Sequence, residues 1–198
     1  TTAYEVGMSR ALSATAKVEV SAYYKDIRGL SQVTTIVSNP TGFSSFRNRD
    51  FGTSKGVDLY LYSERVRRLQ GSVSYSLSYA EGTGSISQSQ RNIAWTGSET
   101  PRQTAPLSFD QRHKTSVSLD YRFGQSDGPR LGGGQPLSRA GVSFLFTAAS
   151  GLPYTPAVVF NEVTLNAVSI TPAGPINSRY GPWTYQLDMK ADKTFQAG

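Results

Sequence analysis

The 198-residue chain contains no cysteine, and it also lacks any long hydrophobic run. Without cysteine, neither disulfides nor thiolate metal sites can form. The most apolar patches, Val142–Ala149 and Ala157–Phe160, are far shorter than the roughly 20 residues that a membrane helix needs. Membrane helices are therefore excluded. Membrane barrels are not, because a barrel strand shows lipid only every second side chain, which is compatible with the mean hydropathy of −0.36.

Positive charge is in excess but is not concentrated. The formal net charge of +6 could indicate a nucleic acid or an anionic surface as partner. However, the Lys and Arg residues are scattered, and their densest cluster, Arg65, Arg67 and Arg68, surrounds a predicted turn. No recognised nucleic-acid-binding motif accompanies them, so no nucleic-acid partner is predicted.

The composition is that of a β protein, with 11 Tyr, 9 Phe and many turn residues. The clearest alternation is in Gln70–Ala80, where apolar residues such as Val73 and Leu77 alternate with a ladder of serines. Successive side chains of a strand point to opposite faces, so this strand has one apolar face and one polar face. The same pattern predicts seven strands: Tyr4–Arg10, Ala16–Asp26, Gly56–Tyr62, Gln70–Ala80, Lys114–Phe123, Ala140–Ala148 and Trp183–Ala191.

Strand length separates a membrane barrel from an ordinary sandwich. Several of the predicted strands have ten or more residues, whereas strands of globular domains usually have about five or six. Ten residues suit a tilted membrane crossing. The apolar faces begin or end with the aromatic residues Tyr24, Tyr79, Phe123, Trp183 and Phe195. Such positions are typical of interfacial aromatic girdles, although ordinary β-propensity enriches the same residue types.

The connections are sorted by length. Leu12–Thr15 and Glu64–Leu69 are short, and Gly124–Ser138 is intermediate. These alternate with three long links: Arg28–Phe46, Glu81–Ser108 and Ser150–Gly181. Bacterial outer-membrane barrels have short periplasmic turns and long extracellular loops. We therefore expect an all-β, antiparallel transmembrane barrel segment in the cell outer membrane, with its first strand running inward and its apolar face against outer-membrane lipid and lipopolysaccharide.

Four local sequences resemble the C-terminal half of the barrel of TonB-dependent outer-membrane receptors. They are Asn48–Leu59 (NRDFGTSKGVDL), Pro106–His113 (PLSFDQRH), Ser150–Pro156 (SGLPYTP), and Asn177–Arg179 followed by Leu187–Lys190 and Phe195. In the last of these, Gly181-Pro182 displaces the proline of the family pattern slightly. The resemblance spans nearly the whole chain, with the motifs in the family's order.

The resemblance implies an energy-coupled receptor for a scarce nutrient, such as a siderophore, vitamin, saccharide or peptide. Its implied partners are a plug domain and a TonB-type energy-coupling protein, and its barrel has 22 strands. Residues 1–198 would then be a partial barrel domain without a plug, because seven strands cannot close such a barrel and both ends of the chain look cut. The alternative is a structural or adhesive outer-membrane barrel without transport.

No enzymatic chemistry is predicted. His113 and Asp110 are three positions apart, which in a strand places them about 10 Å apart on opposite faces, a poor geometry for a Ser-His-Asp array with Ser116. We expect them to order a junction between loop and strand instead. Gly132–Gly134 lacks the Lys-Ser/Thr of a phosphate loop. The scattered aspartates lack calcium-loop spacing, so neither a cofactor nor a metal is predicted.

Two sets of residues are candidates for function. Charged residues of both signs are expected on the lumen face, against the plug: Lys17, Glu19, Lys25, Asp58, Asp120, Arg122, Asp188 and Lys190. Aromatic residues of the long links are the candidates for ligand binding: Phe43, Phe46, Trp95, Tyr154 and Tyr180. Gly52 and Gly56, inside a predicted strand, either leave room for a plug, permit bending or mark a bulge.

Overall fold

The computed structural model describes residues 1–36, 38, 41–89, 91, 102–162 and 167–195, and its main element is one antiparallel sheet. Its seven long strands are β1 (Thr2–Ala11), β2 (Ala16–Ile36), β3 (Phe43–Val66), β4 (Leu69–Gly82), β6 (His113–Arg122), β7 (Ala140–Ala149) and β12 (Thr184–Lys193). The short β5 (Ala105–Pro106) pairs with β4. All seven strands expected from the alternation are present. Within the described residues no helix is long and apolar enough to cross a membrane.

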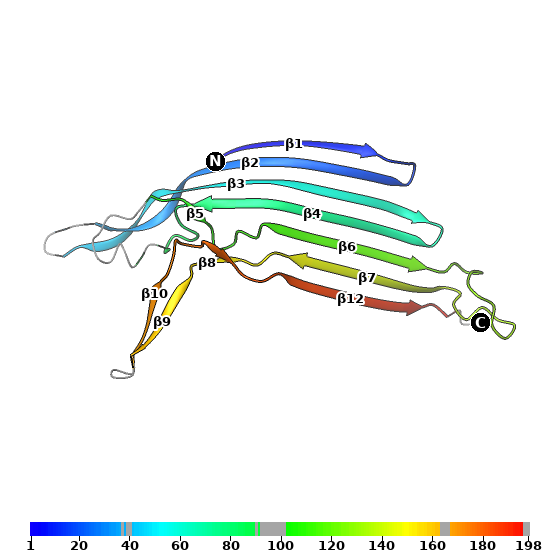
Figure 1. The fold of residues 1–198 in the computed structure, drawn as a ribbon. Coiled ribbons are helices and arrows are strands. Elements are labelled where there is room, and N and C mark those ends of the chain that lie inside the picture. The colour runs from blue at the N-terminus through cyan, green and yellow to red at the C-terminus, as the bar shows by residue number, and fades with distance from the viewer. Residues whose placement is uncertain (37, 39–40, 90, 92–101, 163–166, 196–198) are drawn as a thin grey trace.

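The seven strands neighbour one another in chain order, so the sheet is an up-and-down meander (Figure 1). The connections β1–β2, β3–β4 and β6–β7 lie at one end, here named the turn end (Figure 1). The three long links lie at the opposite end, named the loop end. In the described part of the chain the sheet does not close, and β1 and β12 are its two edges.

The first long link is largely strand, so the prediction of a link over Arg28–Phe46 was wrong for most of its length. β2 and β3 continue past the main sheet and pair as far as Ile36 with Phe43. A register shift at Gly29, where φ is 74°, interrupts the pairing. Because this bulge breaks the period of two, the alternation of the first half of β2 does not extend into the second half.

The other two long links also contain paired segments. Two pairs lie in the last link, Ser150–Gly181: β8 (Pro153–Tyr154) pairs with β11 (Arg179–Tyr180), and β9 (Ala157–Glu162) pairs with β10 (Ala167–Pro172). The β9–β10 hairpin projects away from the loop end of the sheet (Figure 1). In the second long link, Glu81–Ser108, β5 pairs with β4, and Leu107 N–H donates a hydrogen bond to the Ala80 carbonyl at 2.9 Å. The loop end is therefore a folded region.

The register gives the sheet two chemically distinct faces. One row of cross-strand neighbours on the apolar face, from β2 to β12, is Val18, Leu61, Val73, Val117, Phe146 and Leu187. The adjacent row on the polar face is Lys17, Tyr62, Ser72, Ser118, Leu145 and Asp188. Leu145, which departs from the alternation of its strand, is the one aliphatic residue of the polar row. Each strand therefore contributes its apolar side to the same face.

Little of this apolar face is covered. Among the described residues, Val33 and Ala148 are the only buried hydrophobic ones. The side chains of Val6, Leu59 and Leu187 are 71%, 38% and 65% exposed. A sheet with one apolar face normally buries it against a second layer. The described part of this chain supplies no such layer, so the surrounding medium or another polypeptide must cover the face.

Candidate functional site

The polar face gathers every charged residue expected to line the lumen. The register places all eight on this one face, distributed over four strands: Lys17, Glu19, Lys25, Asp58, Asp120, Arg122, Asp188 and Lys190. Charges of both signs alternate with serine and threonine hydroxyls. Such a mixture of charges does not favour ions of one sign.

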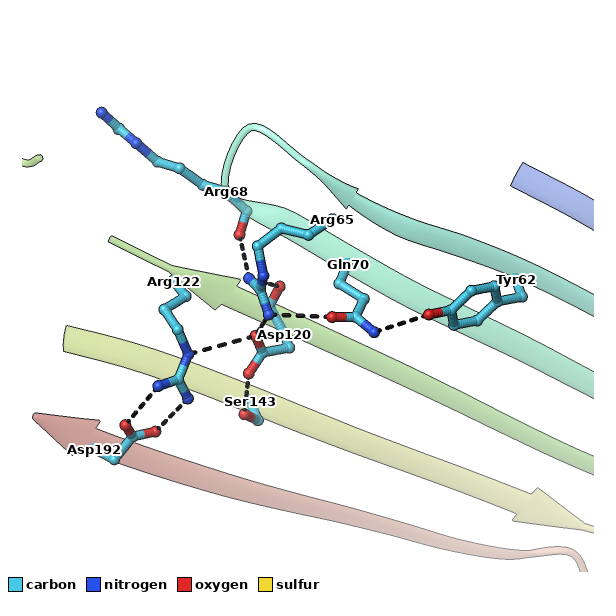
Figure 2. Close-up of polar contacts among 8 residues, drawn as sticks. All are labelled: Tyr62, Arg65, Arg68, Gln70, Asp120, Arg122, Ser143 and Asp192. Carbon is cyan, nitrogen blue, oxygen red and sulfur yellow. Dashed lines mark hydrogen bonds and ion pairs between the residues drawn. The ribbon is translucent and has the colours of Figure 1, made fainter. Parts of the chain in front are cut away.

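Asp120 is the centre of a polar network on this face near the turn end (Figure 2). Its carboxylate forms an ion pair with Arg65, accepts a hydrogen bond from Ser143 Oγ at 2.6 Å, and lies 3.8 Å from Arg122 Nε. Arg122 in turn donates two hydrogen bonds to Asp192, at 3.1 and 2.9 Å. The network links β3, β6, β7 and β12 across the polar face.

Arg65 connects this network to the β3–β4 turn. Its guanidinium donates to the Arg68 carbonyl at 2.9 Å and to Gln70 Oε1 at 3.2 Å, and Gln70 donates to the Tyr62 hydroxyl at 3.2 Å. The sequence identified Arg65 only as part of a basic cluster and did not single out Asp192. Extending the predicted last strand, Trp183–Ala191, by one residue would have included Asp192 on the polar face.

Arg68 belongs to a separate pair outside the sheet. Its guanidinium donates to both carboxylate oxygens of Asp127, with Nε at 2.6 Å, and lies 4.9 Å from the centroid of the Phe123 ring. The hydrogen bond from Arg68 lowers the pKa of Asp127 below its ordinary value. This pair fastens the β6–β7 connection to the β3–β4 turn. Two of the three clustered arginines are therefore engaged with carboxylates rather than presented together to an anionic partner.

Asp110 is the centre of a second polar cluster, at the loop end. Its side chain is almost completely buried. It accepts hydrogen bonds from Ala80 N–H at 2.8 Å and from the Tyr180 hydroxyl at 2.6 Å, and it pairs with Arg112 at 3.4 Å. Burial, and then the hydrogen bond to Asp110, raise the pKa of Tyr180 to about 12. The Arg112 guanidinium lies 4.6 Å from the Tyr180 ring centroid.

The sequence motifs that resemble the receptor family meet around this cluster. Ser150 Oγ accepts a hydrogen bond from His113 N–H at 3.0 Å, and the Ser150 carbonyl accepts one from Gln111 Nε2 at 2.9 Å. Asn177 Nδ2 donates to the Pro106 carbonyl at 2.7 Å. The residues joined by these hydrogen bonds are 37 to 71 positions apart in the sequence. Three of the four motifs are therefore held together where the long links leave the sheet.

The fourth motif is fixed nearby through Asp50. Asp50 is 3% exposed, and its Oδ1 accepts hydrogen bonds from Gln32 Nε2 and the Thr83 hydroxyl, both at 2.8 Å. Two buried aspartates, Asp50 and Asp110, thus hold together the segments where the long links meet the sheet. Because each carboxylate accepts hydrogen bonds from segments distant in sequence, this arrangement serves as structural support.

His113 lies among aromatic rings on the apolar face. Tyr75 Oη is 2.8 Å from His113 Nδ1, and the ring centroid of Trp183 is 5.5 Å from that of the imidazole. Ser116 is on the opposite face of β6, because its position differs from that of His113 by an odd number of residues. The junction role predicted for Asp110 and His113 agrees with the backbone contact between His113 and Ser150.

The aromatic residues predicted to bind ligand fall into two groups. Phe43 and Phe46 are 55% and 57% exposed on the hairpin formed by the ends of β2 and β3. Tyr154 and Tyr180 belong to the small β8–β11 ladder, where Tyr154 is half exposed and Tyr180 is held by Asp110. Trp95 lies outside the described residues. Phe43 and Phe46 therefore present exposed aromatic surface, whereas Tyr180 packs against Asp110 where its link meets the sheet.

A cavity of about 650 Å³ at the loop end was not predicted. Its walls come from three stretches that are distant in sequence, namely residues 82–86 with 89, residues 103–108 and residues 174–178. The lining combines hydroxyl and amide groups, as at Ser85, Gln103 and Asn177, with aliphatic groups, as at Ile86 and Leu107. None of the described residues that line it is charged, so the cavity suits a neutral polar ligand.

Among the described residues, no three His, Cys, Asp or Glu side chains are grouped so that they could hold a metal ion. The chain matches no known family model, no curated protein and no solved structure. The geometry of the two faces, the polar clusters and the loop-end cavity is therefore the basis for a functional proposal.

Proposed function

We propose that this chain forms part of the barrel wall and the outer loops of an outer-membrane receptor that imports a nutrient with energy supplied from the inner membrane. The observation that carries the proposal is the apolar face to which every strand from β1 to β12 contributes, opposite a charged and hydroxylated face. In this proposal lipid covers the apolar face, since the described residues provide no second layer.

The height of the apolar face supports a bilayer as its covering. Tyr79 and Leu69 mark the two ends of the face on β4, ten residues apart. At about 3.3 Å per residue this is roughly 33 Å along the strand. A strand tilted by about 40° then crosses about 25 Å, which equals the height of the apolar band of outer-membrane barrels.

Residues at the two edges of this band also suit membrane interfaces. Near the loop end, Tyr4 pairs with Tyr24, and Lys55 pairs with both Tyr24 and Tyr79. The Lys55 ammonium lies 6.0 Å from the Tyr79 ring centroid. Amphipathic rings, and a lysine whose charged end reaches the interface, are favoured where hydrocarbon meets headgroups. At the turn end, Tyr121 of β6 and Phe123, just after β6, occupy the corresponding level, with ring centroids 5.3 Å apart.

The polar face and the loop end supply the receptor functions in this proposal. The mixed charges of the polar face contact a hydrated plug domain, and the fixed bases of the long links hold the loop-end cavity open to the exterior. The uncharged lining of that cavity favours a neutral, hydroxylated or amide-bearing part of a nutrient. No chemical transformation is required of these residues.

Energy-dependent uptake by the whole protein tests the proposal. A Gram-negative strain that lacks the protein and the same strain expressing it would be compared for accumulation of labelled ferric siderophores, cobalamin, oligosaccharides and peptides. We expect one substrate class to accumulate only with the protein and to fall to background when a protonophore dissipates the proton-motive force. Accumulation that is insensitive to the protonophore, or absent for every class, would contradict energy-coupled import and favour a structural or adhesive barrel.

A further inference from the structure

A hollow of about 460 Å³ interrupts the apolar face at its turn end. The side chains of the apolar face become smaller along β7 from Phe144 to Ala140, and along β12 from Met189 to Ala191. Tyr121 and Phe123 form one wall, and Leu137 of the β6–β7 connection borders the hollow. Its volume lies within the range of roughly 300–1,000 Å³ that ligand sites have.

The mouth of this hollow is basic. Lys193, at the end of β12, is exposed and lines the hollow. Its ammonium contacts the Pro136 carbonyl and lies 5.0 Å from the Phe195 ring centroid, and neither group neutralises its charge. In the described part of the chain Lys193 forms no salt bridge.

The acidic groups near the hollow are already paired. Asp192 lines it but accepts two hydrogen bonds from Arg122 on the polar face. Asp127 is paired with Arg68, whose guanidinium lies over the Phe123 ring. An apolar hollow with an uncompensated ammonium at its rim, level with the edge of the apolar band, complements an acyl chain attached to an anionic headgroup.

From this complementarity we infer that the hollow binds one anionic phospholipid of the leaflet at the turn end. An acyl chain occupies the space beside Tyr121, Val142 and Ala191, and Lys193 contacts the phosphate. The inference rests on the proposed function, because it requires the apolar face to be in lipid. It adds a specific lipid site to a surface that otherwise needs only generic hydrocarbon.

Photocrosslinking of the whole protein in nanodiscs tests the site. The probe is phosphatidylglycerol with a diazirine in one acyl chain, at a trace level in phosphatidylcholine, and labelled peptides are mapped by mass spectrometry. We expect labelling to concentrate on residues 121–142 and 191–195. A phosphatidylcholine probe should label these residues about fivefold less, since one lysine near a headgroup contributes on the order of fivefold in affinity.

Two matched pairs of variants separate headgroup binding from acyl-chain binding. Lys193→Gln should lower phosphatidylglycerol labelling about fivefold, whereas Lys190→Gln, on the polar face of the same strand, should leave it unchanged. Ala191→Trp should fill the hollow and lower labelling by both probes, whereas Ala22→Trp, on the apolar face of β2, should not. Equal effects of the two lysine variants, or labelling spread evenly over the apolar face, would overturn the site.

Protease protection in the same nanodiscs distinguishes failure of the lipid site from failure of the proposed function. A wild-type protein whose strands are digested in nanodiscs has not inserted, and that result contradicts the membrane placement itself. A protein that inserts fully but shows no concentrated labelling contradicts the lipid site alone. Lys193→Gln, at an exposed position, is expected to insert like the wild type.

Discussion

The ring of Tyr23 on β2 lies across Gly56 on β3, on the polar face of the sheet. A Cβ placed on Gly56 would be 2.7 Å from the Tyr23 hydroxyl oxygen, 2.8 Å from a ring carbon and 2.7 Å from the Leu77 carbonyl oxygen. The strand pairing runs through Gly52 and Gly56 without a register shift, so neither glycine marks a bulge. Gly56 provides space for an aromatic ring from the neighbouring strand.

Gly56→Ala should therefore destabilise the sheet. The added methyl group must displace Tyr23 and the β4 backbone, and such overpacking typically costs about 1–3 kcal/mol. The control is Gly7→Ala, whose Cβ would meet its nearest neighbours at 3.5 Å, an ordinary contact. Urea unfolding of the whole protein in lipid measures both. Equal stability of the two variants would show that Tyr23 is not constrained by Gly56.

Asp120→Asn should loosen the turn end of the sheet. The substitution removes the charge that pairs with Arg65 while keeping an acceptor for Ser143, and loss of a charged hydrogen bond costs about 1.5–3 kcal/mol. Asp188→Asn is the matched control, because Asp188 is exposed on the same face and accepts from Gln186 on its own strand. Hydrogen exchange of residues 64–70 should accelerate in the first variant only. Similar exchange in both variants would mean that the Asp120 network adds no local stability.

The stability of the loop end should decline in strong alkali because of Tyr180. Its pKa is raised to about 12 in the folded protein, chiefly by burial, from a value near 10 in an unfolded chain. The folded state thus holds this proton more tightly than the unfolded state. The resulting stabilisation is fully present below about pH 10 and is lost as the pH rises through about 12.

Tyrosinate absorbance measures this shift directly. The titration of the wild-type protein minus that of Tyr180→Phe should contain one phenol with a midpoint about two pH units above the ordinary value. Tyr154→Phe, which alters an exposed tyrosine of the same small ladder, is the control. A difference titration centred near pH 10 for Tyr180 would contradict its burial against Asp110.

Filling the loop-end cavity should weaken nutrient binding. Ile86 lines this cavity and is 66% exposed, whereas Leu131, of similar size and 65% exposed, lies in the connection at the turn end. Ile86→Trp should raise the Kd for the imported nutrient about tenfold or more, since it removes space and displaces polar contacts. Leu131→Trp should leave the Kd unchanged. If the two variants bind equally well, the nutrient site lies elsewhere.

The sheet was predictable from the sequence because alternation is a local property. Each strand shows its own apolar side, as in the Ser72–Tyr79 stretch, and antiparallel pairing then joins those sides into one face. The extension of β2 to Ile36 was not predicted, because the bulge at Gly29 shifts the period and the sequence contains no partner information for Val33. The predicted ends of a strand are wrong where a bulge in the backbone interrupts the alternation.

The polar clusters were less predictable because they depend on register. Arg65 and Asp120 are 55 residues apart, and they meet only because Gln70 pairs with Asp120 across β4 and β6. Likewise, nothing local in the sequence joins Asp110 to Tyr180, 70 residues later. The sequence identified which residues belong to the polar face, and the pairing of strands determines which of them touch.

Accessibility of alternating positions on β3 tests the central claim, that lipid covers the apolar face. Because the chain contains no cysteine, single cysteines can be placed at Asp58, Leu59, Tyr60 and Leu61 without a background from this chain, and spin-labelled in the whole protein in bilayers. Leu59 and Leu61 should be accessible to oxygen and protected from a water-soluble nickel chelate, with the reverse pattern at Asp58 and Tyr60. Protection of Leu59 and Leu61 from both reagents would contradict the account, because it would mean that a second protein layer covers the face.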